Sequence, residues 1–316
     1  MYRAAVNASG SVASLRYLEW AAGPCDQGRI MQIHVSPAKL YLDLMKRCLT
    51  DSIFIDHPLA HVEPFRSDPR RRAWKQLAGS ALSAMAGPAG FAVVEVGDKK
   101  TEAERREARA RGADWPLRAH TMIGSKRLDN LQYCLETVLE DGIAGDFIET
   151  GVWRGGACIF ARAVFQAHGD ASRVVWVADS FSGLPPPDAA AYPADIGDKH
   201  HTLPNLAISA AEVRKNFERY GLLDEQVRFL EGWFKDTLPT APIGKLAVIR
   251  LDGDMYESTI QAIEALYDKL SPGGFLIVDD YFLPPCAKAI HDFRDARGIT
   301  DPIMEIDGIG SFWRRG

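Results

Sequence analysis

Two short apolar segments that end in acids constrain the fold of this chain more than any other feature. They are residues 246–256 (LAVIRLDGDMY) and 274–281 (GFLIVDDY). Each is too short for an isolated helix and is rich in β-branched residues, which predicts two buried parallel strands. Open α/β sheets bind ligands at the edge where the carboxyl ends of their strands emerge. The acids of both segments are therefore expected to converge at a binding edge.

These acids are Asp252, Asp254, Asp279 and Asp280, with no obvious lysine or arginine among them. Converging carboxylates repel one another unless a hard divalent cation lies between them, which favours a magnesium-type site. The alternative is that they cap the helical pattern beginning at Glu257, since Asp is a good N-cap. One acid would fit that explanation, whereas four acids from two strands favour the metal site.

The local backbone sets conditions on this site. Asp252 and Asp254 share a face if their strand stays extended, because side chains alternate along a strand. Asp279 and Asp280 are adjacent, so both can reach one ion only where their strand has ended. These conditions assign ligation to one acid of the first pair and proton transfer to the other.

Composition favours one large α/β domain without an affinity for polyanions. The chain has 316 residues, 47% of them hydrophobic, and a net charge of −5, which makes nucleic acid and an acidic membrane poor default partners. The basic run at residues 99–111 alternates Glu with Arg at helical spacing and is interpreted as a solvated helix face. We expect a flexible extension over residues 1–35 and a single domain over 36–316, with a helical part at 36–140 and the core at 141–316.

The cellular location is predicted from the cysteines and the hydropathy pattern. Five dispersed cysteines without metal-ligand spacing are typical of reduced cytosolic thiols. Neither a run of roughly 20 apolar residues nor a secretory signal is present in the sequence, so we predict a cytoplasmic protein with no membrane segment. Residues 40–49 form an amphipathic helical pattern, which is a candidate contact between subunits.

A glycine motif marks a second site. Residues 146–162 (DFIETGVWRGGACIFAR) have the order strand, glycine loop, helix, with Glu149 at the strand end and Arg154 in the loop. The spacing ExGxxxGG suits a cofactor with a cationic amino-acid part and a ribose better than a pyrophosphate, although glycines also form plain turns. The next strand ends at Asp179, the position where nucleoside-binding α/β domains hold ribose hydroxyls.

Four ordered blocks resemble the macrocin O-methyltransferase family, which consists of metal-dependent enzymes that methylate sugar hydroxyls of glycosylated natural products with S-adenosylmethionine. They are residues 149–156 (ETGVWRGG), 178–185 (ADSFSGLP), 251–259 (LDGDMYEST) and 278–282 (VDDYF). The likeness extends from about residue 40 to residue 314. It implies a class I methyltransferase fold, an α/β Rossmann-like sheet flanked by helices, with an N-terminal helical extension. Residues 192–205 are polar and contain Pro and Gly, which favours a lid that excludes water, and the alternative is a plain surface loop.

The resemblance also implies roles for individual residues. The methionine end of S-adenosylmethionine is assigned to Thr121, Met122, Ile123, Glu149 and Gly151, its ribose to Asp179 and Ser180, and its adenine to Gly232 and Trp233. The ligands of Mg²⁺ are assigned to Asp252, Asp279 and Asp280, and the general base to Asp254. The partner implied is a glycosylated small-molecule acceptor, and because the relatives form homo-oligomers we expect one here.

Alternatives remain at this point. His120, His200 and His201 are candidate bases that we rank below Asp254. A catechol-type O-methyltransferase acting on small phenols would share the magnesium site and the vicinal-hydroxyl chemistry. A nicotinamide-dependent oxidoreductase is disfavoured because the glycine motif lacks the pyrophosphate pattern.

Overall fold

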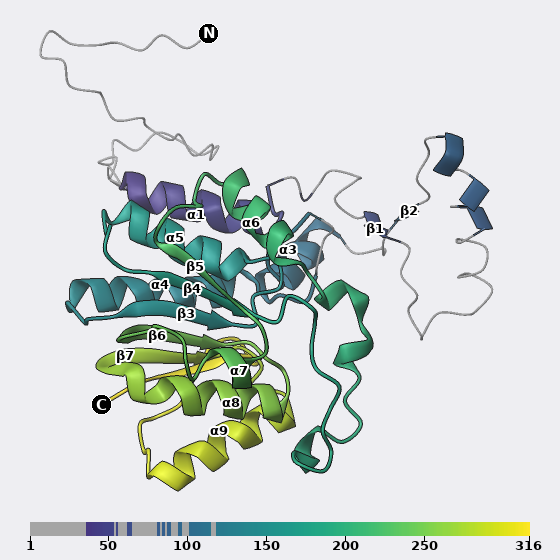
Figure 1. Ribbon diagram of the computed structural model, residues 1–316. Helices are drawn as coiled ribbons and strands as arrows, with labels where there is room; N and C mark the ends of the chain where they lie inside the picture. Colours follow the sequence, from purple (N-terminus) through teal and green to yellow (C-terminus); the bar gives the residue numbers. More distant parts are fainter. Residues whose placement is uncertain are drawn as a thin grey trace, which may run out of the picture.

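The computed structural model describes residues 36–53, 55, 62–64, 81–82, 84–85, 87–89, 94–96, 101–114 and 118–316. The predicted extension at residues 1–35 lies outside them. The described chain forms a seven-stranded sheet with helices on both faces (Figure 1). This arrangement confirms the predicted α/β fold.

The sheet has the strand order β5-β4-β3-β6-β7-β9-β8. Five strands are parallel, namely β3 (Asp146–Thr150), β4 (Val175–Asp179), β5 (Val227–Glu231), β6 (Leu246–Leu251) and β7 (Leu270–Val278). The last two, β8 (Met304–Glu305) and β9 (Ser311–Arg314), run antiparallel to their neighbours. The two acid-ending segments thus belong to adjacent parallel strands, β6 and β7, as predicted. The strand order reverses between β3 and β6, which is where open α/β sheets place their ligands.

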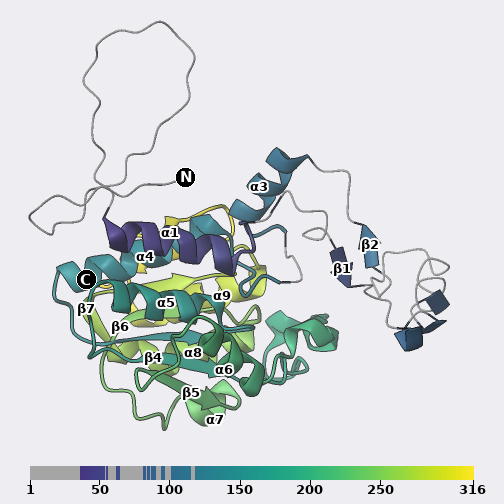
Figure 2. The ribbon, with the colours of Figure 1, turned by 90° about the horizontal axis from the view of Figure 1, so that it is seen from above.

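The sheet divides the core into two layers, and helices cover each of them (Figures 1 and 2). One face is covered by α1 (Pro37–Leu49), α4 (Ser125–Glu140), α5 (Gly156–Ala167) and α6 (Ala210–Arg219). The other is covered by α7 (Phe234–Thr237), α8 (Tyr256–Leu266) and α9 (Pro284–Arg297). Strand side chains alternate between the layers, so that Phe147 packs in the first cluster and the next residue, Ile148, in the second.

The amphipathic pattern at residues 40–49 forms most of α1. Ser36 caps this helix by accepting a hydrogen bond from the Lys39 backbone N–H at 3.1 Å. Leu42 and Leu49 are buried against the core, whereas Leu40 and Leu44 are half exposed on the outer side. The helix therefore has one apolar face in the core and an additional apolar strip on the surface.

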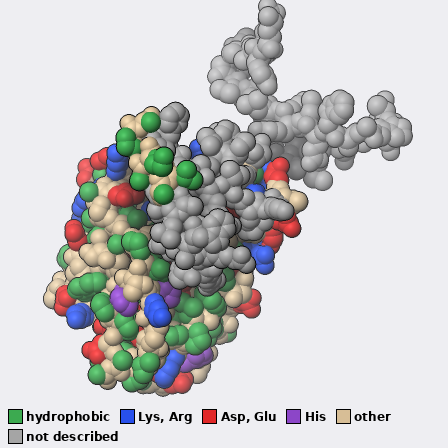
Figure 3. All heavy atoms as spheres, turned by 90° about the vertical axis from the view of Figure 1, so that its right-hand side faces the viewer, with side chains coloured by type: hydrophobic (Ala, Val, Ile, Leu, Met, Phe, Trp, Pro, Cys, Tyr) green, Lys and Arg blue, Asp and Glu red, His purple; other side chains and the backbone are tan. Residues whose placement is uncertain are grey.

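The basic run at residues 99–111 contains the helix α3 (Glu102–Ala110). Its Arg106 pairs with Glu102 on the exposed side, as the interpretation of a solvated face requires. Arg109 differs, because it is buried and donates to the Asp114 carboxylate at 2.9 Å. On the side of the molecule drawn in Figure 3, positive and negative side chains of the described residues are interspersed with hydrophobic ones.

Short elements complete the described chain. The strands β1 (Val62–Pro64) and β2 (Val94–Val96) pair antiparallel, and the 3₁₀ turns are η2 (Gly87–Ala89), η3 (Pro193–Asp195), η4 (His200–Thr202), η5 (Pro204–Leu206) and η6 (Tyr267–Lys269). The described cysteines, Cys48, Cys134, Cys158 and Cys286, are free thiols. Among the described helices, none combines the length and apolarity that crossing a membrane requires.

Candidate active site

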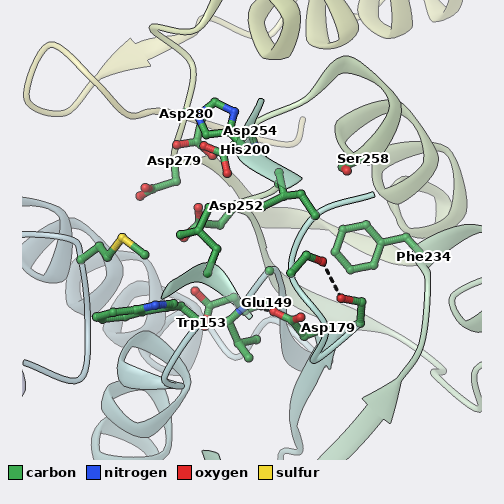
Figure 4. A pocket seen from close by; sticks show the side chains of 18 of the residues that line it. Glu149, Trp153, Asp179, His200, Phe234, Asp252, Asp254, Ser258, Asp279 and Asp280 are labelled. Atoms are coloured by element: carbon green, nitrogen blue, oxygen red, sulfur yellow. Dashed lines mark hydrogen bonds between the residues drawn. The ribbon is translucent and has the colours of Figure 1, made fainter. Parts of the chain in front are cut away.

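A cavity of about 650 Å³ opens at the carboxyl edge of the parallel strands. All the predicted cofactor and metal residues and the preferred base line it: Thr121, Met122, Ile123, Glu149, Gly151, Asp179, Ser180, Gly232, Trp233, Asp252, Asp254, Asp279 and Asp280. In the view of Figure 4, Glu149 and Asp179 lie at one end, Asp279 and Asp280 at the other, and Asp252 between them. The predicted nucleoside and metal sites therefore share one cavity.

The loop between β3 and α5 forms the wall at the end of Glu149. Gly151 has φ +88°, and a Cβ built on it would lie 1.7 Å from the Asp252 carbonyl oxygen. Only glycine fits this position, because both the backbone conformation and the contact exclude a side chain. Gly155, with φ +84°, is the N-cap of α5. The glycines therefore do more than form a turn, since Gly151 lets the loop approach the end of β6 and Gly155 lets it pack against Val213 of α6.

Asp179 fixes the same loop. Its carboxylate accepts hydrogen bonds from the backbone N–H groups of Val152 at 2.7 Å and Phe181 at 2.8 Å. Burial raises the pKa of Asp179, and these backbone hydrogen bonds oppose that rise. Its neighbour Ser180 donates to the Gly183 carbonyl at 2.7 Å. The Trp153 backbone and the Ser180 side chain also hydrogen-bond to Asp179, so this carboxylate holds the glycine loop and the loop after β4 together.

Glu149 is a buried acid with two protein partners. It accepts from the guanidinium of Arg250 and, at 2.8 Å, from the Cys158 thiol. Burial raises its pKa to about 7, while the charge of Arg250 opposes the rise. A cationic group of a ligand beside Glu149 would favour the charged form of this acid.

The predicted metal ligands meet beyond the ends of β6 and β7. One oxygen from each of Asp252, Asp279 and Asp280 lies within 4.8 Å of the others. The strand β7 ends at Val278, so Asp279 and Asp280 lie beyond it and can reach one position. This meets the condition stated for two adjacent acids that share an ion. Three carboxylates with hard oxygen donors at this separation fit a divalent cation such as Mg²⁺.

Asp254 differs from its predicted geometry. We expected an extended strand that keeps Asp252 and Asp254 on one face, but β6 ends at Leu251 and Asp254 has φ +56°. Its backbone N–H donates to the Asp280 carboxylate at 3.1 Å. Burial, followed by the charge of Asp252, raises its pKa to about 7. The acid still lines the cavity, although it reaches this position through a left-handed backbone.

The expectation that no cation lies among the acids is wrong. Arg250 on β6 contacts Glu149, Asp252 and Asp279, while Arg127 on α4 contacts Asp279 and Asp307. Both oxygens of Asp279 therefore accept from a guanidinium. Arg250 lies within residues 246–256, an otherwise apolar segment predicted to be a buried strand. A charged residue at such a position indicates buried partners of opposite charge.

The helix-capping alternative is also wrong for these acids. The N-cap of α8 is Met255, which makes no side-chain cap. The cap comes instead from Asp195 in η3, whose buried carboxylate accepts from the backbone N–H groups of Tyr256 at 2.7 Å and Glu257 at 2.9 Å. The helix end is thus satisfied from a distant segment, which leaves Asp252 and Asp254 to the cavity.

The polar segment at residues 192–206 borders the cavity opening. Besides the Asp195 cap, it is fixed by the Trp153 indole, which donates to the Asn205 carbonyl at 2.8 Å. Leu203 and Asn205 line the cavity. The segment therefore connects the glycine loop to the start of α8 beside the cavity.

The three candidate histidines have different surroundings. His200 lines the cavity, with its Nδ1 at 2.6 Å from the Asp198 carboxylate. His120 contacts the Tyr220 hydroxyl at 2.8 Å, and burial lowers its pKa to about 4. Such a pKa makes His120 a weak base near neutral pH. His201 is exposed on η4.

The strand order and this site define a class I O-methyltransferase. Residues 38–315 match the family described as macrocin-O-methyltransferase (TylF). The chain belongs to this family, and it is an O-methyltransferase. The match covers the residues at both ends of the cavity.

Relatives of known activity are similar over most of their length. The chain is 53% identical over 276 residues to 8-demethyl-8-(2,3-dimethoxy-alpha-L-rhamnosyl)-tetracenomycin-C 4'-O-methyltransferase of Streptomyces olivaceus, covering 87% of this chain and 92% of the relative. It is 55% identical over 212 residues to mycinamicin III 3''-O-methyltransferase of Micromonospora griseorubida, covering 66% of this chain and 84% of the relative. The solved structure of the O-methyltransferase NovP is 44% identical, with a TM-score of 0.71, and the match covers 88% of this chain and 99% of that chain.

Proposed function

We propose that this enzyme transfers a methyl group from S-adenosylmethionine to a sugar hydroxyl of a glycosylated natural product and requires Mg²⁺. One observation carries the proposal: Asp252, Asp279 and Asp280 converge within 4.8 Å in the same cavity as the glycine loop and Asp179. The names of the relatives, which include a rhamnosyl-tetracenomycin methyltransferase and a mycinamicin methyltransferase, support the acceptor class. The nicotinamide alternative falls with membership of a methyltransferase family.

The donor is held in this proposal by the loops around β3 and β4. Glu149 and the Thr121–Ile123 loop hold its methionine end beside Gly151, and Asp179 with Ser180 holds its ribose. Trp233 is about one-third exposed at the cavity wall, where its ring is available to stack on adenine. The segment at residues 192–206 excludes competing water.

The acceptor is oriented by the acids at the ends of β6 and β7. When bound to Asp252, Asp279 and Asp280, Mg²⁺ supplies Lewis acidity that lowers the pKa of an acceptor hydroxyl. Asp254 receives the hydroxyl proton on its carboxylate, for which a pKa of about 7 is well matched. The fixed positions of donor and acceptor align the oxygen with the sulfonium methyl for an in-line displacement.

The proposal also includes the assembly and location of the enzyme. We infer a single domain over residues 36–316 that forms a homo-oligomer in the cytoplasm. The half-exposed Leu40 and Leu44 on α1 support a subunit contact, and the free cysteines are consistent with a reducing compartment. Light scattering of the purified chain tests the oligomer, and a monomer at micromolar concentration would contradict it.

The reaction is tested with chelator-treated enzyme, S-adenosylmethionine and a panel of rhamnosylated polyketides, with products identified by mass spectrometry. We expect methylation of a sugar hydroxyl only after Mg²⁺ is restored. We expect two adjacent hydroxyls of the acceptor to bind Mg²⁺ together. Matched acceptors whose adjacent hydroxyl is absent or already methylated should therefore lose turnover. Full activity in chelator excludes the metal mechanism, and preferential methylation of a parallel catechol panel favours the small-phenol alternative.

A further inference from the structure

Arg250 is a buried cation that lies behind the cavity wall and contacts three acids of that wall. It is 1% exposed, and its guanidinium lies between Glu149 at the end of β3 and Asp279 after β7. Nη1 donates to both Glu149 and, at 2.7 Å, Asp252, whereas Nη2 donates to Asp279. One rigid group therefore holds an acid of the donor site and two acids of the metal site.

The strand register explains this position. Arg250 is paired directly with Glu149 between the parallel strands β3 and β6, so both side chains emerge on the same face of the sheet. Asp252 lies two residues further along the chain, just after β6. The carboxylates outnumber the guanidinium by three to one, so the hydrogen-bonding capacity of Arg250 is shared among them. A change in the charge of one carboxylate alters how strongly Arg250 binds the others.

We propose that Arg250 is a positioning residue that couples the methyl-donor site to the metal site. The inference rests on the proposed function, in which Glu149 holds the donor and Asp252 and Asp279 hold Mg²⁺. When the cationic end of the donor approaches Glu149, that carboxylate attracts Arg250 less. The guanidinium then pairs more completely with Asp252 and Asp279, which reduces their availability to a metal. Donor and metal therefore oppose each other's binding through this side chain.

Glutamine at position 149 imitates the neutralised acid without changing its shape. We expect Glu149→Gln to raise the Mg²⁺ Kd by about three- to tenfold, although residue 149 is not among the metal carboxylates. Loss of a nearby negative charge would also weaken Mg²⁺ binding directly through space. The effect through Arg250 and the direct effect through space are separated by measuring how Glu149→Gln changes the Mg²⁺ Kd in a variant whose residue 250 no longer bridges the acids.

The experiment is a double-mutant cycle with the Mg²⁺ Kd as its readout. Isothermal calorimetry with MgCl₂ is performed on chelator-treated parent, Glu149→Gln, Arg250→Lys and the double variant. Lysine keeps the positive charge but lacks the planar guanidinium, whose two terminal nitrogens donate to different acids. We expect Glu149→Gln to change the Kd less than twofold in the Arg250→Lys background. An equal change in both backgrounds would overturn the inference.

Glu257→Gln is the matched control. Glu257 is a buried acid of the same cavity whose carboxylate accepts from Gln261 at 3.0 Å. Its replacement should alter the Mg²⁺ Kd by the same factor whether residue 250 is arginine or lysine. If the effect of Glu257→Gln on the Mg²⁺ Kd depended on Arg250 as strongly as the effect of Glu149→Gln, Arg250 would respond to any nearby charge. That result would also overturn the inference. Arg250→Gln is the second background if the lysine variant does not fold.

Reciprocal titrations complete the test. S-adenosylhomocysteine, which cannot transfer a methyl group, is titrated with and without saturating MgCl₂. Its Kd should rise about threefold or more with Mg²⁺ in the parent and should be nearly independent of Mg²⁺ in Arg250→Lys. Parent protein that binds neither ligand would reject the proposed function itself. Parent protein that binds both, independently of each other, would reject only the coupling by Arg250.

Discussion

Two acids, one from each half of the cavity, are kept in place in different ways. In the donor half, at the ends of β3 and β4, Asp179 accepts from backbone N–H groups of its own and the neighbouring loop. In the acceptor half, at the ends of β6 and β7, Asp279 accepts from the guanidinium groups of Arg250 and Arg127. Backbone donors add no net charge, whereas each guanidinium adds one. Asp179 is therefore held by local chain geometry, whereas Asp279 is held by charges from distant elements.

The largest expected effect tests whether chemistry in the acceptor half is separable from binding in the donor half. Asp254→Asn should lower kcat by about 10²- to 10⁴-fold, because the amide cannot accept the hydroxyl proton. Affinity for S-adenosylmethionine, measured by calorimetry, should stay near that of the parent. A fully active Asp254→Asn enzyme would assign the base to His200, His120 or His201 instead.

The role of charge in the acceptor half is tested by Arg127→Met. Asp279 and Asp307 would lose a buried cationic partner, which costs about 3 to 5 kcal/mol of unfolding free energy. Urea titration monitored by circular dichroism measures the loss. Arg106→Met is the matched control, since Arg106 and its partner Glu102 are more than half exposed and such pairs contribute about 0.5 kcal/mol or less. Equal losses in the two variants would show that the buried network does not stabilise this half.

The donor half is tested by Asp179→Ala. The change removes the proposed acceptor of two ribose hydroxyls, which also accepts from the loop N–H groups, so donor affinity should fall by about 2 to 3 kcal/mol, or roughly 30- to 150-fold. Calorimetry with S-adenosylmethionine measures the change. Asp170→Ala is the control, because Asp170 also accepts from backbone N–H groups, of Ser172 and Arg173, but does not line the cavity. Unchanged affinity in Asp179→Ala, together with binding of NADH, would contradict the donor assignment.

The smallest expected effect is a difference in the sign of pH dependence. Folding lowers the pKa of His120 from 6.5 to about 4, so the unfolded chain binds more protons and the parent loses stability as the pH falls through this range. Folding raises the pKa of Asp254 from 3.8 to about 7, so that contribution is lost as the pH rises through its own range.

Melting temperatures between pH 4 and 7.5, recorded without metal, distinguish these contributions. The stability difference between parent and His120→Gln should shift in the parent's favour as the pH rises. The difference between parent and Asp254→Asn should shift against the parent over the same range. Parallel profiles would contradict the opposite signs expected for His120 and Asp254.

Local patterns made the donor half predictable from the sequence. Glu149, the glycines and the α5 helix are contiguous, so strand, loop and helix follow from one short segment. The acids after β6 and β7 were predictable as a group because parallel strands end at one edge. Their cationic partners were not, since the pairing of Arg250 with Glu149 depends on a register between strands about 100 residues apart.

Long-range contacts account for the other differences. Asp195 caps α8 from 61 residues away, and Arg127 reaches Asp279 across 152 residues. Nothing near Asp195 in the sequence indicates a helix that it would cap. The extended geometry expected for Asp254 failed because the strand ends three residues earlier, and the end of a strand is poorly defined by its own composition.

The contact between Gly151 and the Asp252 carbonyl restricts how this enzyme can diversify. A combinatorial library that randomises residue 151 should return glycine alone, even under selection for folding without catalysis, because the smallest side chain would displace the strand end that carries a proposed metal ligand. Acceptor range must then evolve elsewhere. Phe282 and Leu203 line the cavity and are well exposed, so they offer variable positions at which a new aglycone can be accommodated without disturbing the backbone.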